Sequence, residues 1–280
     1  MAQKVVVVLG KTGSGKSSLC NVMAGKSHDD KDFPTSSDVK SCTHDVKSQK
    51  VNFLGDQDRP VTLVDTIGFD DPDRNDKTEV ITEVIKKLTD HVDTFVIVVN
   101  GQNPRLDGSL ERMLKIFGEA FTNAFWRHVV VVFTRLSMDE HSTLRRCQKR
   151  QNRSDDEWAR QFLAEVEKLA GVSLKYLFID ALHLESGDEL RKYVDSMEEL
   201  YKFISTSKGL KTDKEKQTEF VINCMQEEHQ KKDDEARREV NKLKEEKLEG
   251  AREAERLRGI AERAEDEAKQ ERKAKEEKKN

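Results

Sequence analysis

The chain has 280 residues, of which 35% are hydrophobic and 37% are charged, and its formal net charge at pH 7 is -4. An average globular domain carries roughly 25% charged residues, so we expect part of this chain to lie outside any packed core. The charge balance is untypical of a nucleic-acid-binding protein, and no apolar run reaches the length of roughly 18 residues that spans a membrane. We therefore predict no nucleic-acid partner and no transmembrane segment, and any membrane contact is expected to be peripheral.

The cysteine pattern and the first residues indicate the compartment. The four cysteines are widely spaced and form no C-x-x-C pair, which argues against a zinc site and against a disulfide framework. The apolar run at residues 5–9 is too short for the core of a signal peptide. We expect a cytoplasmic protein in a reducing environment.

Short apolar runs alternate with longer amphipathic segments over about the first 205 residues. The strand-like runs are residues 5–9, 61–64, 95–99, 129–133 and 176–179, and the helix candidates are residues 16–24, 77–88, 108–117 and 155–169. Because the runs are almost wholly apolar, we expect helices on both faces of a mainly parallel sheet. Imperfect alternation within residues 43–53 predicts a sixth strand, at an edge. The pattern predicts an α/β, doubly wound domain over residues 1–207.

Residues 208–280 have a different character, because 41 of the last 70 residues of the chain are charged. We expect a long charged helix, and three arrangements fit it: a solvated single helix held by i,i+4 ion pairs, a weak coiled coil, or disorder. A heptad pattern from Val240 to Ala268 is interrupted by Lys247 and Gly250, so a helical partner would meet a thin apolar seam. The apolar segment 220–225 is predicted to dock on the globular domain or on a partner.

An eight-residue motif of the form G-x-x-x-x-G-K-S follows the first strand run and precedes the first helix candidate. Its residues are Gly10, Lys11, Thr12, Gly13, Ser14, Gly15, Lys16 and Ser17, and Ser18 follows. Glycines in such a loop let successive backbone N–H groups point at phosphates, beside the positive end of the following helix. In this pattern Lys16 reaches the β and γ phosphates and Ser17 ligates Mg²⁺. The motif predicts a nucleoside triphosphate site; a glycine-rich turn without a ligand is the alternative.

A second motif, Asp65-Thr66-Ile67-Gly68, ends the apolar run at residues 61–64. A carboxylate at this place in phosphoryl-transfer proteins holds Mg²⁺, usually through water, and the glycine N–H approaches the γ-phosphate. Its position about 50 residues after the first motif and at a strand end favours this interpretation over an ordinary turn.

The polar segment Ser41-Cys42-Thr43 lies between the two motifs and would cross the nucleotide mouth. A threonine there closes over Mg²⁺ and the γ-phosphate in GTPase switches and is released on hydrolysis. We choose Thr43, although other hydroxyls in the segment are alternatives. The predicted catalytic residues are thus Lys16, Ser17, Thr43 and Gly68, and the predicted metal ligands are Ser17, Thr43 and Asp65.

Phe69 follows the second motif, at the place where Ras-like proteins carry a glutamine that orients the attacking water. A phenyl ring cannot position water by hydrogen bonding. We therefore predict slow hydrolysis by the monomer and acceleration by a partner or a second copy of the chain.

The base-reading segments depart furthest from a familiar pattern. The strand run at residues 129–133 leads into Thr134, Arg135 and Ser137, where GTPases place Asn/Thr-Lys-x-Asp, so Ser137 stands where a carboxylate grips guanine. Asp139 is an alternative carboxylate, and Arg135 is expected to stack on the base. The backbone N–H of Ala181, after the last strand run, is expected to meet the purine carbonyl; a plain loop is the alternative.

In combination these motifs resemble the immunity-associated GTPases, the GIMAP or IAN family in the septin-like branch of P-loop GTPases. The resemblance covers roughly residues 4–205 and is carried by residues 10–18, 33–43, 65–69, 105–107, 116–119 and 133–135. It implies GTP and GDP binding with Mg²⁺, contact of Thr35 with the nucleotide, and self-association through the nucleotide face. Ile67, Leu136-Ser137 and Asp180-Ala181 depart from the family pattern, and the last two concern the guanine base.

We therefore predict a guanine-nucleotide-binding switch protein with slow intrinsic GTP hydrolysis that is controlled by nucleotide-dependent dimerisation or oligomerisation. The residues predicted to bind the nucleotide are 10–18, Thr35, Asp65, Thr134, Arg135 and Ala181. Two alternatives stay open: a nucleotide-bound scaffold that hydrolyses little or nothing and acts through its helical tail, and an ATPase of the same fold.

Overall fold

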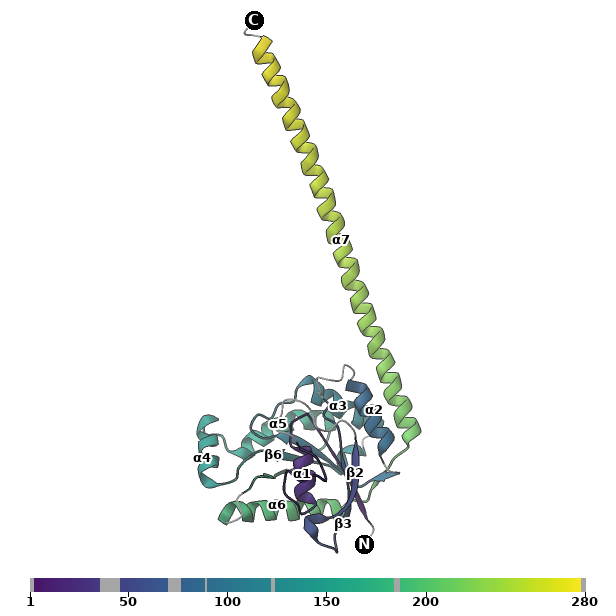
Figure 1. Ribbon diagram of the computed structural model, residues 1–280, viewed down its shortest axis with the longest axis vertical. Coiled ribbons are helices and arrows are strands. Elements are labelled where there is room, and N and C mark those ends of the chain that lie inside the picture. Colours follow the sequence, from purple (N-terminus) through teal and green to yellow (C-terminus); the bar gives the residue numbers. More distant parts are fainter. Residues whose placement is uncertain are drawn as a thin grey trace. The chain divides into compact units, whose positions relative to one another are not determined.

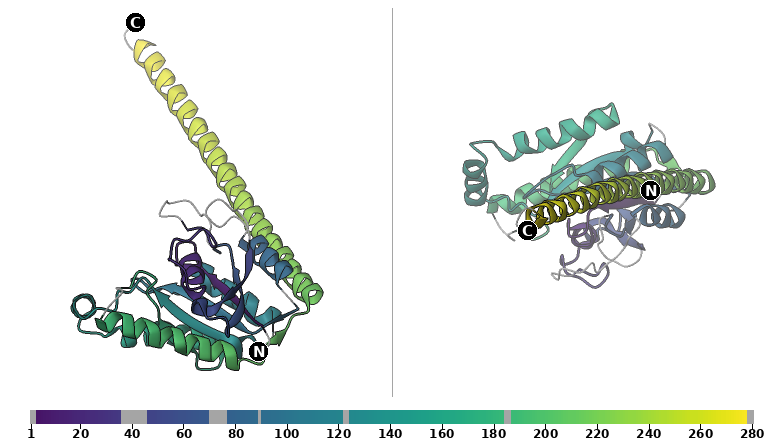
Figure 2. Two further views of the ribbon diagram at one scale, coloured as in Figure 1. Left: turned by 60° about the horizontal axis from the view of Figure 1, so that its bottom comes forward. Right: turned by 90° about the horizontal axis from the view of Figure 1, so that it is seen from above.

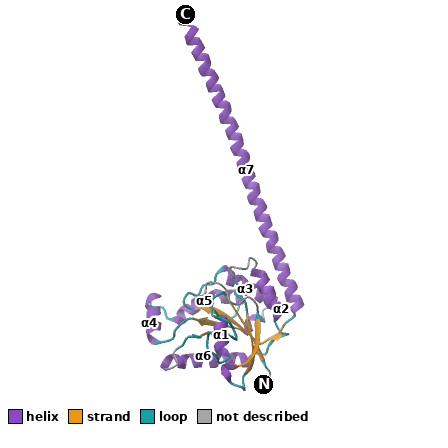
Figure 3. Ribbon diagram, in the orientation of Figure 1, coloured by secondary structure: helices purple, strands orange, loops and turns teal. Residues whose placement is uncertain are grey.

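The computed structural model describes residues 3–35, 46–69, 77–88, 90–121, 124–183 and 187–277. The chain divides into two compact units, Met1–Asn223 and Cys224–Asn280. The first unit contains a central sheet with helices packed on it, and Figure 3 shows the strands lying between the helices. No helix of the described segments is both long and apolar enough to cross a membrane.

Six strands form the central sheet, in the order β2-β3-β1-β5-β6-β7. Their bounds are β1 (Lys4–Gly10), β2 (Lys47–Asn52), β3 (Pro60–Asp65), β5 (Thr94–Asn100), β6 (Val129–Thr134) and β7 (Lys175–Phe178). The edge strand β2 pairs antiparallel with β3, and all other pairs are parallel. The predicted mainly parallel, six-stranded sheet is confirmed, including the polar edge strand.

The apolar sequence of β1 reflects burial on both faces. Val5, Val7 and Leu9 belong to one hydrophobic cluster, while Val6 and Val8 belong to the other, because successive side chains of a strand point to opposite faces. The first cluster includes residues of α2 (Lys77–Lys87), α3 (Gly108–Ala120) and α5 (Asp155–Ala170), and the second includes residues of α1 (Lys16–Met23) and α6 (Gly187–Thr206). Figure 1 shows these helices on opposite sides of the sheet.

Two helices were absent from the sequence prediction. The first, α4 (Glu140–Lys149), buries none of its side chains, so it has no apolar periodicity to detect. It lies at one edge of the first unit, in teal at the left of both views in Figure 2. The second, α6, packs Met197, Leu200 and Ile204 into the core at helical spacing. Short 3₁₀ helices at Phe53–Gly55 and Phe125–His128, labelled η1 and η2, complete the helical segments.

The first unit extends past the predicted domain boundary at residue 207. A small sheet pairs β4 (His91–Val92) with β8 (Leu210–Lys211), and α7 (Lys214–Glu277) begins directly afterwards. Val221 of α7 is fully buried in the first hydrophobic cluster, and Phe220 packs against it. The predicted docking of segment 220–225 therefore holds for its first two residues, and Ile222 is exposed.

The second unit consists of the remainder of α7, which agrees with the predicted charged C-terminal helix. Among its described side chains, the large apolar ones of Val240, Leu243, Leu248 and Leu257 are exposed. Among its charged residues, Lys242 pairs with Glu246 and Arg256 pairs with Glu253 at helical spacing. The coiled-coil arrangement stays a prediction.

Candidate functional site

The glycine-rich loop connects β1 to α1 at the carboxyl edge of the parallel strands. Gly15 caps the N-terminus of α1 with a backbone φ of 94°, a left-handed conformation that favours glycine. Lys16 begins the helix, is only 6% exposed, and donates a hydrogen bond of 2.8 Å from Nζ to the carbonyl of Lys11. The loop therefore closes on its own lysine and presents a helix N-terminus, which suits a phosphate group.

Ser17 and Asp65 come together beside this loop. The Ser17 hydroxyl donates a hydrogen bond of 2.6 Å to Oδ2 of Asp65, which is the last residue of β3. Burial raises the pKa of Asp65, which is only 1% exposed, while the positive charge of Lys16 and the hydrogen bond from Ser17 lower it. The other carboxylate oxygen, Oδ1, is buried without a hydrogen-bond partner. A hydroxyl and a carboxylate with one unpartnered oxygen fit Mg²⁺, which prefers oxygen ligands.

Gly68 lies directly against the glycine-rich loop. A Cβ atom at Gly68 would stand 2.5 Å from the backbone nitrogen of Thr12, so no larger residue fits without movement. The structure thus brings the two predicted phosphate-side motifs into contact. Thr43 lies outside the described residues, so its predicted switch role stays a prediction.

Phe69 points into the core. Its side chain is 1% exposed and packs edge-to-face on Phe117, with ring centroids 6.1 Å apart. The residue that follows Gly68 therefore contributes an anchor for α3 and no polar group to the site.

Thr134 links the base-side segment to the glycine-rich loop. Its hydroxyl donates a hydrogen bond of 2.6 Å to the carbonyl of Ser14 and is 3.3 Å from the carbonyl of Val99. Thr134 therefore has a structural role, because it holds the glycine-rich loop to β6. Its contact with the nucleotide stays a prediction. Arg135 follows with a left-handed backbone φ of 59°.

Ser137 is held between two carboxylates. Its hydroxyl lies 2.6 Å from Oδ2 of Asp139 and 2.8 Å from Oε1 of Glu189, a buried residue of α6 that also accepts the N–H of Met138. Asp139 caps α4 by accepting the N–H of Ser142 at 2.8 Å. Hydrogen bonds from Ser137 and Ser142 hold the pKa of Asp139 well below its usual range. Asp139 thus caps a helix and is not among the residues that line the cavity described next.

A cavity of about 990 Å³ is lined mostly by residues at the ends of β1, β5, β6 and β7 and in the loops that follow these strands. We call it the nucleotide cavity. Of the predicted residues it is lined by Gly13, Gly15, Ser18, Thr35, Thr134, Arg135 and Ala181. Ser137 and Asp180, from the predicted base-side segments, also line it. The remaining polar lining residues His28, Asp29 and Gln102 carried no predicted role. Gln102 was detectable, since it follows a parallel strand at its carboxyl end.

Lys11 and Thr12 line a separate cavity of about 370 Å³, together with the loop after β5. Lys11 forms an ion pair with Asp107, the residue that caps α3. Burial acts to raise the pKa of Asp107, but hydrogen bonds from Lys11 and from the N–H of Leu110 outweigh it and lower the pKa. The lining residues of the nucleotide cavity do not include Gly10, Ser14, Lys16, Ser17 or Asp65. Ser17 and Asp65 form a metal-compatible pair beside the glycine-rich loop.

Comparisons with known proteins give a family match and several similar solved structures. Residues 5–134 match the family described as 50S ribosome-binding GTPase. No protein of curated function matches at a significant level. The solved structures that match include chloroplast translocon components. One is a dimerisation-deficient mutant of Toc33 from Arabidopsis thaliana, with TM-score 0.53, 16% identity and coverage of 80% of this chain and 86% of that one.

Two further matches carry information on ligands and assembly in their own proteins. Arabidopsis thaliana Toc33 in complex with GDP and Mg²⁺ has TM-score 0.52 and 17% identity, and the match covers 76% of this chain and 89% of that one. A structure of atToc33 and psToc159, described as showing that dimerisation is important for GTPase activity, has TM-score 0.56 and 14% identity, with coverage of 75% and 86%. The chain has the α/β fold of the P-loop GTPases.

Proposed function

We propose that this protein binds GTP and GDP with Mg²⁺ and hydrolyses GTP. The observation that carries the proposal is the hydrogen bond of 2.6 Å between Ser17 and Asp65 beside the buried Lys16, with one oxygen of Asp65 left unpartnered. Ser17 and Asp65 would hold Mg²⁺, which neutralises charge on the phosphates when bound. Lys16, the backbone N–H groups of the loop and Gly68 would orient the terminal phosphate, and Thr43 would close over it. The Toc33 structures with GDP and Mg²⁺ support the choice of ligands.

Guanine selectivity is proposed to rest on Asp180 and the backbone of Ala181. Asp180 is 8% exposed, lines the nucleotide cavity, and uses Oδ1 to accept the N–H of Leu182 at 3.1 Å. A buried carboxylate after β7 can accept hydrogen bonds from the two adjacent N–H donors on the edge of guanine. Adenine does not have two such adjacent donors. Ser137 does not replace it, because its hydroxyl already lies between Asp139 and Glu189.

Competition against a fluorescent GDP analogue tests this part. We expect GTP and GDP to displace the probe and ATP to be at least tenfold weaker, a free-energy difference of about 1.4 kcal/mol. Asp180→Asn should lower that ratio, whereas Asp29→Asn, which changes an exposed carboxylate of the same cavity, should leave it unchanged. Equal displacement by ATP and GTP with the unmodified protein would contradict the guanine assignment and favour an ATPase.

Slow hydrolysis by the monomer and control by self-association are also proposed. Support comes from Phe69, which is buried in the core and offers no hydrogen bond to water, and from the dimerisation described for atToc33 and psToc159. Turnover per molecule should rise with protein concentration, in step with dimer formed in the presence of GTP. Constant turnover across a hundredfold concentration range would remove this proposal, and absent turnover at every concentration would favour a nucleotide-bound scaffold.

The finer family placement has support from sequence motifs alone. We propose the immunity-associated, septin-like branch because residues 10–18, 65–69 and 133–135 resemble it. We further propose that the exposed apolar side chains of α7 between Val240 and Leu257 meet a helical partner, as in a weak coiled coil.

A further inference from the structure

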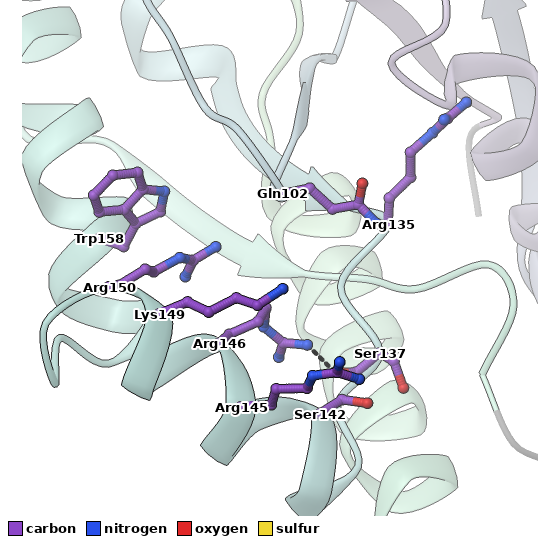
Figure 4. A pocket seen from close by; sticks show the side chains of 9 residues that line it. All are labelled: Gln102, Arg135, Ser137, Ser142, Arg145, Arg146, Lys149, Arg150 and Trp158. Atoms are coloured by element: carbon purple, nitrogen blue, oxygen red, sulfur yellow. Dashed lines mark hydrogen bonds between the residues drawn. The ribbon is translucent and has the colours of Figure 1, made fainter.

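A second cavity lies beside the nucleotide cavity, and five of its nine lining residues are arginines or lysines. It measures about 620 Å³, and its lining residues are Gln102, Arg135, Ser137, Ser142, Arg145, Arg146, Lys149, Arg150 and Trp158. No aspartate or glutamate is among them. Figure 4 shows Arg146, Lys149 and Arg150 extending into a common space, with Trp158 beyond them, while Arg135 extends away from this group. We call this the basic cavity.

The positive charge of the basic cavity is only partly compensated. Arg146 and Arg150 both bind the same buried carboxylate, Asp155, at 2.7 Å and 2.6 Å. One negative charge therefore serves two guanidinium groups. Burial, together with the positive charge of Arg146, lowers the pKa of Arg150 against the opposing effect of Asp155. Within the described segments, neither Arg145 nor Lys149 forms an ion pair, and both are exposed.

Two of the cations are fixed in place before any ligand arrives. Arg146 donates a hydrogen bond of 2.7 Å to the carbonyl of Ser137, and Arg150 donates one of 3.0 Å to the carbonyl of Gly101. The Arg150 guanidinium also lies over the ring of Trp158, 5.0 Å from its centroid. Guanidinium groups held in this way lose little conformational entropy when they bind an anion.

A solvated surface helix is the simplest alternative explanation for these charges. Two observations argue against it. The cations of residues 145–150 line a cavity, and two of them are partly buried around one carboxylate. Crowding like charges costs stability, so the arrangement favours a compensating anion.

We propose that the basic cavity is a binding site for a small ligand that carries several phosphate groups. An arginine fork pairs with phosphate oxygens through two parallel hydrogen bonds, and Arg145 is exposed and able to do so, with Lys149 beside it. Arg146 and Arg150 already bind Asp155 and add mainly positive charge. A single phosphate would engage only part of a cavity of about 620 Å³ with four cations from residues 145–150. A free polyphosphorylated metabolite and a phosphorylated lipid headgroup share this chemistry.

The two cavities share Gln102, Arg135 and Ser137. Arg146 and Arg150 also bind the carbonyls of Ser137 and Gly101, which belong to the loops after β6 and β5, so the charge of a bound anion acts on both loops through these hydrogen bonds. Ligand bound in the basic cavity should therefore change nucleotide affinity, and nucleotide should change ligand affinity by the same factor. This coupling rests on the proposed nucleotide function, whereas the anion site itself does not.

Titration calorimetry with inositol trisphosphate tests the site on the full chain. The protein is saturated with GDP and excess Mg²⁺, so that the glycine-rich loop is occupied. We expect one ligand per chain, and about tenfold weaker binding in the double variant Arg145→Gln with Lys149→Gln, which loses two charged contacts. The matched control is Lys202→Gln with Lys208→Gln, which removes two exposed cations elsewhere in the first unit and should bind as the unmodified protein does.

Three outcomes would overturn the site: undetectable binding to the unmodified protein at millimolar ligand, equal weakening in both double variants, or binding that GDP abolishes. Retained binding in Lys16→Ala, which lacks the phosphate lysine, would support an independent site even if the protein failed as a GTPase. Vesicles of phosphatidylcholine with and without phosphatidylinositol bisphosphate distinguish the sources. Cosedimentation that needs the phosphorylated lipid and Arg145 with Lys149 supports a headgroup, and binding of the free ligand alone supports a metabolite.

Discussion

The Ser17 hydroxyl and Oδ2 of Asp65 are joined by a hydrogen bond of 2.6 Å, although 48 positions separate the two residues in the sequence. The contact ties the first turn of α1 to the end of β3. Because Asp65 is almost fully buried, this arrangement keeps a carboxylate in surroundings that disfavour its charge. Groups whose pKa is perturbed by burial and by a nearby charge cluster at functional sites.

Replacing Asp65 should separate folding from metal binding. Asp65→Asn should leave the nucleotide-free protein as stable as before, or more stable, because it removes a buried charge. Mg²⁺-dependent tightening of GDP binding should be lost. Thermal unfolding without ligand and GDP titrations with and without Mg²⁺ measure the two effects, and a large drop in thermal stability would contradict this account.

The raised pKa of Asp65 also predicts the sign of a pH effect on the nucleotide-free protein. Between the ordinary pKa and the raised folded-state pKa, the folded chain binds more protons than the unfolded chain. The contribution of Asp65 to stability therefore decreases as the pH rises through that window. Denaturant unfolding at several pH values should show this decrease in the free energy of unfolding of the unmodified protein relative to Asp65→Asn. An identical pH profile in the two proteins would speak against a perturbed Asp65.

Phe69 is a core residue. We predict that replacing it by glutamine does not create a water-orienting side chain. Phe69→Gln should lower the free energy of unfolding by roughly 3–5 kcal/mol, since it removes a buried ring and buries an amide. GTP turnover should not rise. Phe69→Leu is the matched control and should cost about 1 kcal/mol. Faster hydrolysis by a stably folded Phe69→Gln protein would show that this side chain reaches the nucleotide.

Asp155 should be important for stability because it holds two arginines. Asp155→Asn leaves Arg146 and Arg150 side by side without a counter-charge and should lower the free energy of unfolding by about 3 kcal/mol. Asp195→Asn removes an exposed carboxylate from α6 and should change it by less than about 0.5 kcal/mol. Urea denaturation of both variants measures the difference; similar midpoints would mean that the two arginines do not depend on Asp155.

The boundary of the first unit can be tested by truncation. A chain ending at Asn223 should unfold at the temperature of the full chain, because the compact unit ends there. A chain ending at Ser207 loses the β4–β8 pairing and the fully buried Val221, so its melting temperature should fall by several degrees. Equal melting temperatures for the two truncations would show that residues 208–223 contribute nothing to this fold.

Local patterns predicted the central sheet well. Strands such as β1 can be recognised by their consecutive apolar residues, because both of their faces are covered. The helix α4 was missed for the opposite reason, since it buries none of its side chains. The boundary at residue 207 was placed where the composition changes, yet the first turns of α7 still supply Val221 to the core.

The sequence by itself determined the phosphate side of the site, because residues 10–17 are consecutive and their backbone conformation follows from glycine and from the start of a helix. Only the tertiary structure decided the base side and the basic cavity. Asp180, Gln102 and Ser137 reach one cavity from three strand ends, and Glu189 reaches Ser137 from α6. Such contacts join residues far apart in the chain, so their chemistry depends on how the sheet and helices pack.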